Sequence, residues 1–160
     1  MAEALETAPE GQSIRFGPLA ESLGFLLRLA QLRSFEDFFA NLADKGVRPG
    51  EMSVMIVIQD NPGIRQGVVA RALHIKRAHM AKMARALEDE GMISRSVPQD
   101  DKRAMELRLT EAGEARLATL RPAFERHEAS HVSGLTAAEA EQLRSLLRKY
   151  LNIEDGGRIA

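Results

Sequence analysis

The sequence predicts a mainly α-helical domain that contains one small β-hairpin, an α+β fold class. Apolar residues recur at three- and four-residue spacing over most of the chain, as they do on the buried faces of helices. The spacing changes to two only between residues 92 and 109, which is typical of paired strands. A chain of 160 residues is too short for two domains of ordinary size. We expect a disordered acidic arm at residues 1–13 and a single domain at residues 14–160.

Four helices are expected before the hairpin. Pro49 suits the first turn of the second helix, and Asn61-Pro62-Gly63 ends it. The third and fourth helices are separated by a very short turn at His74, and Gly91 ends the fourth as a C-terminal cap. The expected ranges of these helices are about 18–43, 49–60, 66–73 and 76–90.

The hairpin follows directly. Residues 92–97 and 105–109 are the expected strands, and Pro98 to Arg103 form the tip. Thr110 then caps a fifth helix, and Thr136 opens a capping box for the last one. Two short helices followed by a charged hairpin are the pattern of a winged helix-turn-helix, whose second helix can enter the major groove of DNA.

The charge of the chain is balanced only on average. The formal net charge of -1 argues against a protein that coats nucleic acid by bulk charge. Residues 61–87, however, carry six basic side chains and no carboxylate. These are Arg65, Arg71, Lys76, Arg77, Lys82 and Arg85. Soluble helices usually mix both signs, so we favour a phosphate-facing surface over a merely solvated basic face.

The fourth helix has two distinct faces at 100° per residue. The face expected to lie in the core holds Met80, Met83, Ala84 and Leu87. The outward face holds Ala78, Lys82 and Arg85, with His79 and Ala81 at its flanks. Lysine and arginine bind phosphates or guanine edges, His79 can donate to a base, and a small alanine can contact a thymine methyl group.

The order and spacing of several short motifs identify a family resemblance. The motifs are Leu87-Glu88 with Gly91, then Arg95, then Asp101-Lys102-Arg103, then Leu109-Thr110-Glu111-Ala112-Gly113. With them, most of the chain resembles the MarR family of bacterial winged-helix transcriptional regulators, most of which are repressors. The resemblance implies a winged helix-turn-helix at 47–113 between dimerisation helices at 14–46 and 114–152. It also implies that Arg103 enters the minor groove, and that Asp101 pairs with a nearby arginine to hold the shape of the wing.

A set of DNA-contacting residues follows from the charge, the helix face and the resemblance. The set is Arg65, Gln66, Lys76, Arg77, Ala78, His79, Lys82, Arg85, Asp101 and Arg103. The chain departs from the family pattern at three kinds of position. Arg65 and Lys76 stand where relatives often have Ser or Thr, His74 stands where the turn usually has Gly, and His79 replaces a small hydroxyl residue. The operator sequence that relatives recognise is therefore not carried over to this chain.

The terminal helices carry more apolar surface than a small winged domain can cover. This predicts a homodimer, and hence a pseudo-palindromic double-stranded DNA site. The alternative is a monomer whose terminal helices fold back on the domain. Size-exclusion chromatography with light scattering separates the two.

The resemblance also implies a small-molecule effector, commonly an anionic aromatic, in a crevice between the dimerisation helices and the DNA-binding part. The residues available for such a crevice are Phe25, Leu29, Met52 and Met55, with Arg28 or Arg33 for a carboxylate. The alternative is that these apolar residues only pack in the core. A further alternative is a zinc-responsive regulator, because His127 and His131 share one helix face; a surface or crevice position is the default for this pair.

Other classes of protein are disfavoured. The sequence contains no phosphate-binding glycine loop, nucleophile elbow or metal-hydrolase motif, so an enzyme is not expected, nor is a cofactor. The absence of cysteine excludes thiol-based sensing. The apolar run from Met52 to Ile58 is too short for a membrane span, and the N-terminus lacks a targeting signal, which fits a cytoplasmic protein. A winged-helix module that binds another protein remains the main rival.

Overall fold

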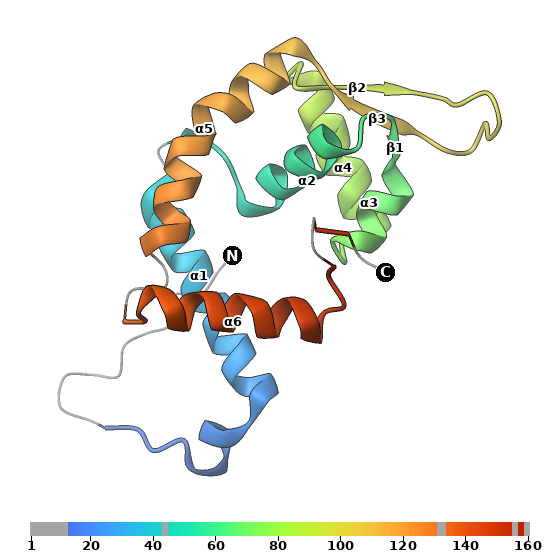
Figure 1. Ribbon diagram of the computed structural model, residues 1–160. Helices are drawn as coiled ribbons and strands as arrows, with labels where there is room; N and C mark the ends of the chain where they lie inside the picture. The colour runs from blue at the N-terminus through green and yellow to red at the C-terminus, as the bar shows by residue number, and fades with distance from the viewer. Residues whose placement is uncertain (1–12, 43–44, 131–133, 155–156, 159–160) are drawn as a thin grey trace.

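A computed structural model describes residues 13–42, 45–130, 134–154 and 157–158. It confirms the predicted mainly helical fold with a small sheet (Figure 1). Its helical elements are the 3-10 helix η1 (Gly17–Glu21) and the α-helices α1 (Leu23–Leu42), α2 (Pro49–Asp60), α3 (Gln66–Ala72), α4 (Arg77–Asp89), α5 (Glu111–Ser130) and α6 (Ala137–Tyr150). Its strands are β1 (Ile64–Arg65), β2 (Ile93–Ser96) and β3 (Glu106–Leu109).

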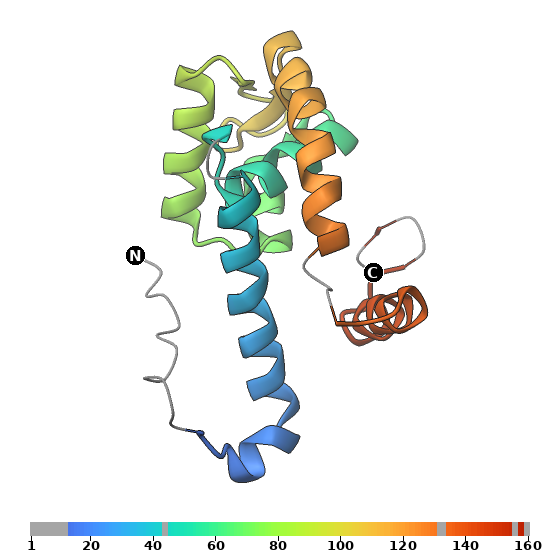
Figure 2. The same ribbon diagram turned by 90° about the vertical axis from the view of Figure 1, so that its left-hand side faces the viewer.

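The long helices α1 and α5 pack against each other and carry the winged part at one end. The hairpin of β2 and β3 projects from that end as a wing (Figure 1). Helix α6 stands to one side of the α1 and α5 pair (Figure 2). The arm expected at residues 1–13 lies almost wholly outside the described residues.

Two hydrophobic clusters hold the domain together. The first lies inside the winged part and joins α2, α3, α4 and the sheet; its fully buried members include Ile58, Val69, Met80 and Leu107. The second joins α1, α2 and α5 through Phe38, Met52 and Leu120. Because α2 contributes to both clusters, it couples the winged part to the long helices.

The sheet has one strand more than the sequence predicted. In the described part of the chain its order is β1-β3-β2, and both pairs are antiparallel. The strand β1 has only two residues, too few to show an alternating pattern, which explains why it was missed. It pairs Ile64 with Leu107 and leads directly into α3, so it ties the helix-turn-helix to the wing.

Two turns fix the helices of the winged part. His74, between α3 and α4, has φ of 52°, a left-handed conformation, at the position where the family pattern usually has glycine. Gly91 has φ of 73° at the end of α4. There the N–H groups of Gly91 and Met92 donate to the carbonyls of Glu88 and Leu87, each at 2.8 Å, which closes the helix.

The motif from Leu109 to Gly113 joins the wing to α5. The Thr110 hydroxyl accepts from the Gly113 N–H at 3.0 Å and donates to the Gly91 carbonyl at 2.6 Å. A Cβ atom at Gly113 would lie 2.0 Å from the Met92 carbonyl oxygen. Only glycine therefore lets α5 begin this close to the start of β2.

Candidate nucleic-acid interface

Helix α4 presents the two faces that the sequence predicted. Met80 and Ala84 are fully buried, Leu87 is 4% exposed, and Met83 is half-buried. The residues on the other face are all exposed: Ala78, His79, Ala81, Lys82 and Arg85. The outward face is thus small and basic, and its shape suits a DNA groove.

A basic cleft lies beside this helix, between α3, α4 and the wing. Its volume is about 420 Å³. Among the described residues, its charged lining consists of Arg65, Arg71, Arg77, Arg103 and Asp101. Met80 and Met105 form part of its apolar lining. Guanidinium groups match phosphate geometry, so the cleft, which we call the arginine cleft, is suited to hold a nucleic-acid backbone.

The arginine cleft is assembled from parts far apart in sequence. Arg65 comes from β1, Arg71 from α3, Arg77 from the first turn of α4 and Arg103 from the wing tip. Arg71 was in the predicted basic segment but not in the predicted DNA-contacting set. Its signal was present in the sequence, because it belongs to the carboxylate-free stretch.

The ion pair at the wing is not the one that the resemblance implied. Arg65 Nη2 lies 2.5 Å from Asp100 Oδ2, while Asp101 forms no ion pair with any described residue. Instead, Asp101 Oδ1 accepts a hydrogen bond from the Arg103 backbone N–H at 3.0 Å. Aspartate in a tight turn commonly binds the backbone two residues later, and this local bond replaces the expected pairing. Asp101 still shapes the wing, but through the backbone.

The other predicted contacts lie at the entrances to the two short helices. Arg65 precedes α3 and Lys76 precedes α4, and both are exposed. Gln66 begins α3 and lines the arginine cleft. Its side-chain oxygen is buried and has no hydrogen-bond partner among the described residues. Lys76, Lys82 and Arg85 do not line the cleft, so the predicted set is divided between the cleft and the outward face of α4.

A second ion pair joins α4 to the wing. Arg95 Nε donates to Glu88 Oε2 at 2.7 Å, and Arg95 Nη2 donates to the same oxygen. The hydrogen bonds from the Arg95 side chain hold the pKa of Glu88 below its ordinary value of 4.5. Both residues belong to the motifs that carried the family resemblance, but sequence reasoning assigned them no role.

The predicted effector residues are not brought together. Met52 lines two cavities, one of about 230 Å³ with Phe35, Phe38 and Phe124, and one of about 180 Å³ with Arg121. Met55 is buried in the winged core. Phe25, Arg28 and Leu29 line neither of these two cavities, because they lie in the first turns of α1, far from α2.

His127 is a buried residue of α5. Its side chain is 2% exposed and meets the ring of Phe38 edge-to-face, with ring centroids 5.4 Å apart. His131 lies outside the described residues. Within the described ranges no three histidine or carboxylate side chains are grouped so that they could hold a metal ion. The zinc-responsive alternative thus gains no support from this part of the chain.

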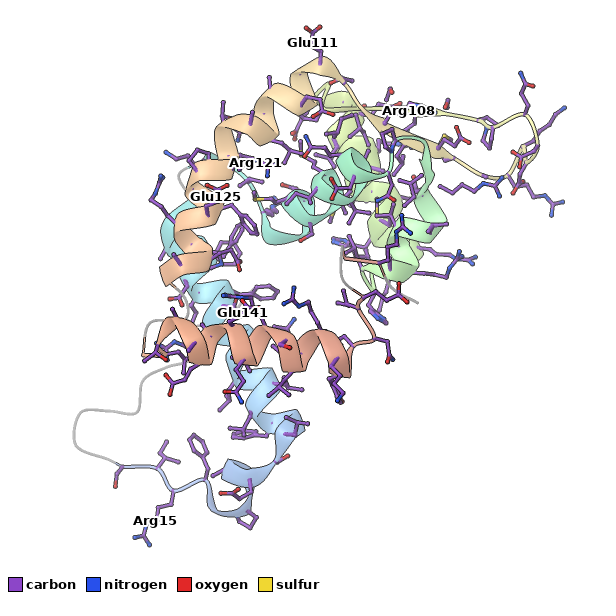
Figure 3. The ribbon with its side chains drawn as sticks, viewed as in Figure 1. Arg15, Arg108, Glu111, Arg121, Glu125 and Glu141 are labelled. Atoms are coloured by element: carbon purple, nitrogen blue, oxygen red, sulfur yellow. The ribbon has the colours of Figure 1, made fainter. Side chains whose placement is uncertain are left out.

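Apolar side chains remain exposed on the outer helices. Leu23, Leu26, Phe35 and Phe39 of α1 and Leu143, Leu146 and Tyr150 of α6 are 41–63% exposed. In Figure 3, Arg108 lies at the base of the wing and Arg15 lies at the opposite end of the molecule. No helix in the described part of the chain is both long and apolar enough to cross a membrane.

Known proteins resemble this chain in sequence and in fold. The model of the MarR family matches residues 47–105. A Thauera aromatica protein, named as a transcriptional regulatory protein for the hcr operon, is 33% identical over 134 residues, 83% of this chain and 81% of the relative. The repressor CouR bound to a 23-mer DNA duplex matches with a TM-score of 0.79 and 34% identity, over 87% of this chain and 99% of CouR. CouR bound to p-coumaroyl-CoA matches with a TM-score of 0.75 and 33% identity, over 86% and 97%.

Proposed function

The chain belongs to the MarR family of transcriptional regulators, and on that premise we propose that it is a homodimeric repressor that binds a specific double-stranded DNA site in the cytoplasm. The arginine cleft beside an exposed, basic α4 is the observation that carries the proposal. The similarity to a DNA-bound repressor supports it.

In the proposed complex, α4 lies in the major groove. Lys82 and Arg85 then face base edges or phosphates, while Arg65, Arg71 and Arg77 in the cleft hold the adjoining backbone. Arg103 at the wing tip reaches the neighbouring minor groove, whose negative potential attracts an arginine.

The proposed dimer uses the apolar outer helices. Exposed apolar residues on α1 and α6 of one protomer are covered by a second copy. A two-fold dimer places its two recognition helices about 34–36 Å apart, one turn of DNA. The operator is accordingly a pseudo-palindrome.

The proposed effector is a small aromatic acid or its thioester. CouR, which is similar to this chain, has been solved with p-coumaroyl-CoA. The 230 Å³ cavity is lined by Phe35 and Phe38 of α1, Met52 of α2 and Phe124 of α5. A ligand there contacts both the long helices and the winged part, so it can favour one arrangement of the two over another.

The test is binding of the full chain to the DNA upstream of its own gene, with and without candidate aromatic acids and thioesters. Hydroxyl-radical footprinting is expected to show two protected half-sites one helical turn apart. Lys82→Ala and Arg103→Ala are each expected to weaken binding by about five- to a hundredfold without unfolding the protein. Arg15→Ala, which removes an arginine from the end opposite the wing, is the matched control (Figure 3). Equal binding by all three variants contradicts the proposal.

A further inference from the structure

The ion pair between Glu88 and Arg95 spans the junction of α4 and the wing. Glu88 is in the last turn of α4, and Arg95 is the third residue of β2. The Arg95 guanidinium contacts Glu88 Oε2 through both Nε and Nη2. The two side chains are only 18% and 35% exposed for Arg95 and Glu88, so solvent shields this pair less than an ordinary surface pair.

Arg95 lies on the inner face of the wing. Neighbouring residues of a strand point to opposite faces, so Arg95 shares its face with Ile93, which is 2% exposed. Arg95 also stands opposite Leu107, which is fully buried. Ser94 and Ser96 are exposed on the other face. The ion pair therefore continues the contact between α4 and β2 beyond Ile93, the last residue of β2 in the hydrophobic core.

Besides the hydrophobic core, two polar contacts between α4 and β2 hold the junction. The first is the turn at Gly91, where the N–H groups of Gly91 and Met92 bind the carbonyls of Glu88 and Leu87. The second is the side-chain bond from Glu88 to Arg95, four residues further along the chain from Gly91. The core residues Ile93 and Leu107 hold the base of the wing, and the contact at Arg95 adds a hold further along β2. Beyond Arg95, β2 ends at Ser96 and the chain continues to the tip that carries Arg103.

The positive charge of Arg85 adds to the need for a carboxylate at Glu88. The charge of Arg85, one turn before Glu88 on α4, also contributes to the lowered pKa of Glu88. With Glu88 neutral, Arg85 and Arg95 are two like charges with no carboxylate between them. The wing is then expected to move away from α4.

We infer that Glu88 is a positioning residue for DNA recognition: its bond to Arg95 sets the spacing between α4 and the wing, so that Arg103 meets the minor groove while α4 lies in the major groove. The inference rests on the proposed function. Loss of this bond is expected to affect recognition in the minor groove and not in the major groove. Side chains of α4 read the bases in the major groove directly, while recognition of the minor groove by Arg103 depends on the angle of the wing.

The first experiment measures where discrimination is lost. Fluorescence anisotropy compares wild type and Glu88→Gln on duplexes of the bound upstream DNA that carry single A·T to G·C changes, either in the footprint of α4 or in that of the wing. Discrimination here is the ratio of the affinities for the unchanged and the changed duplex. For changes under the wing, we expect Glu88→Gln to lower this ratio from about tenfold to below about threefold. For changes under α4, we expect the ratio to stay within about twofold of wild type. The exchange Glu88→Arg with Arg95→Glu is expected to restore part of the loss.

The matched control removes the same charge from a comparable contact elsewhere. Glu141 on α6 pairs with Arg144 and Arg148 at 3.0 Å, far from the wing (Figure 3). Glu141→Gln is expected to leave discrimination under the wing unchanged. Full wing discrimination in Glu88→Gln, or an equal loss under α4 and under the wing together with a lower melting temperature, overturns the inference.

The second experiment does not depend on DNA. Because the chain lacks cysteine, Ala86→Cys on α4 and Lys102→Cys at the wing tip accept spin labels at those two positions alone. Pulsed electron spin resonance, with labelled chains diluted in unlabelled protein, is expected to give one narrow distance that broadens or lengthens in Glu88→Gln. An unchanged distance overturns the positioning role even when DNA binding is found. If wild type does not bind DNA but the distance between the labels still changes in Glu88→Gln, the proposed function is contradicted. The role of the ion pair between Glu88 and Arg95 in holding the wing against α4 is then still supported.

Discussion

At the residue scale, neighbouring residues of the wing bind different partners. Asp100 and Asp101 are adjacent, yet the first binds the Arg65 side chain and the second binds the Arg103 backbone. The family resemblance implied that Asp101 would pair with an arginine and hold the wing. Asp100 forms the ion pair instead, because β1 places Arg65 beside it. Likewise, the contact between Glu88 and Arg95 needs the turn at Gly91 to bring them together.

Asp100→Asn is expected to strengthen DNA binding about two- to fivefold at low salt. In the free protein Arg65 is paired with the Asp100 carboxylate, and that exposed pair must open before Arg65 binds a phosphate. Fluorescence anisotropy against the upstream DNA measures the effect. Glu141→Gln removes a carboxylate far from the arginine cleft and is the control. Weaker binding by Asp100→Asn would show that the pair helps to hold the DNA-bound form of the wing.

Gly113→Ala is expected to destabilise the protein by about 1–3 kcal/mol, because a Cβ there would lie 2.0 Å from the Met92 carbonyl oxygen. The control is Gly67→Ala in α3, where a Cβ has no heavy atom within 4 Å. That change is expected to be neutral or slightly stabilising. Urea denaturation at one fixed protein concentration compares the three proteins. An equally stable Gly113→Ala protein would contradict the close packing of α5 on β2.

At the element scale, the helix ends and the two faces of α4 were predictable from sequence. The capping residues, the turn at His74 and the inward set around Met80 all depend on local spacing. The strand β1 was too short to be recognised, and the helix expected from about residue 18 is interrupted at Ser22, between η1 and α1. The predicted effector residues on α1 lie N-terminal to the residues of α1 that line the 230 Å³ cavity, since helical periodicity does not tell which turns of α1 face α2 and α5.

The capping box of α6 gives an acid-dependent prediction. The backbone N–H of Thr136 donates to Glu139 at 2.7 Å and lowers the pKa of Glu139 below 4.5. A depressed carboxyl pKa contributes stability above the ordinary value, and this is lost as the pH falls through the folded value. Glu139→Gln is therefore expected to lower the stability of α6 at pH 7 and to have a smaller effect near pH 3. Circular dichroism at both pH values checks this, and an equal difference at the two would contradict the role of the charge.

At the scale of the whole molecule, tertiary structure creates the features that matter most for function. Arg65, Arg71, Arg77 and Arg103 were each visible as basic residues, but their convergence in one cleft was not. The net charge of -1 conceals that cleft, because it averages over the entire chain. The exposed apolar faces of α1 and α6, in contrast, were anticipated by composition and helical spacing alone.

Dimerisation is tested on α6. Leu146 and Tyr150 are 58% and 63% exposed, so glutamate at both positions is expected to leave the fold of one chain intact and to separate the protomers. Light scattering after size-exclusion chromatography would then report a monomer, with the loss of most DNA affinity. Lys149→Glu changes the charge of the same helix at a position without an apolar side chain, and is expected to remain dimeric. A dimeric double variant would place the interface elsewhere.

The central claim is that the arginine cleft holds DNA, and the dependence of binding on salt tests it most directly. The logarithm of the binding constant for the upstream DNA is expected to fall linearly with the logarithm of salt concentration. Replacing Arg65, Arg71 or Arg77 singly by alanine is expected to reduce that slope by about one for each phosphate contact that is lost, while Arg15→Ala leaves it unchanged. A slope that none of these three cleft substitutions alters would contradict the assignment of the cleft.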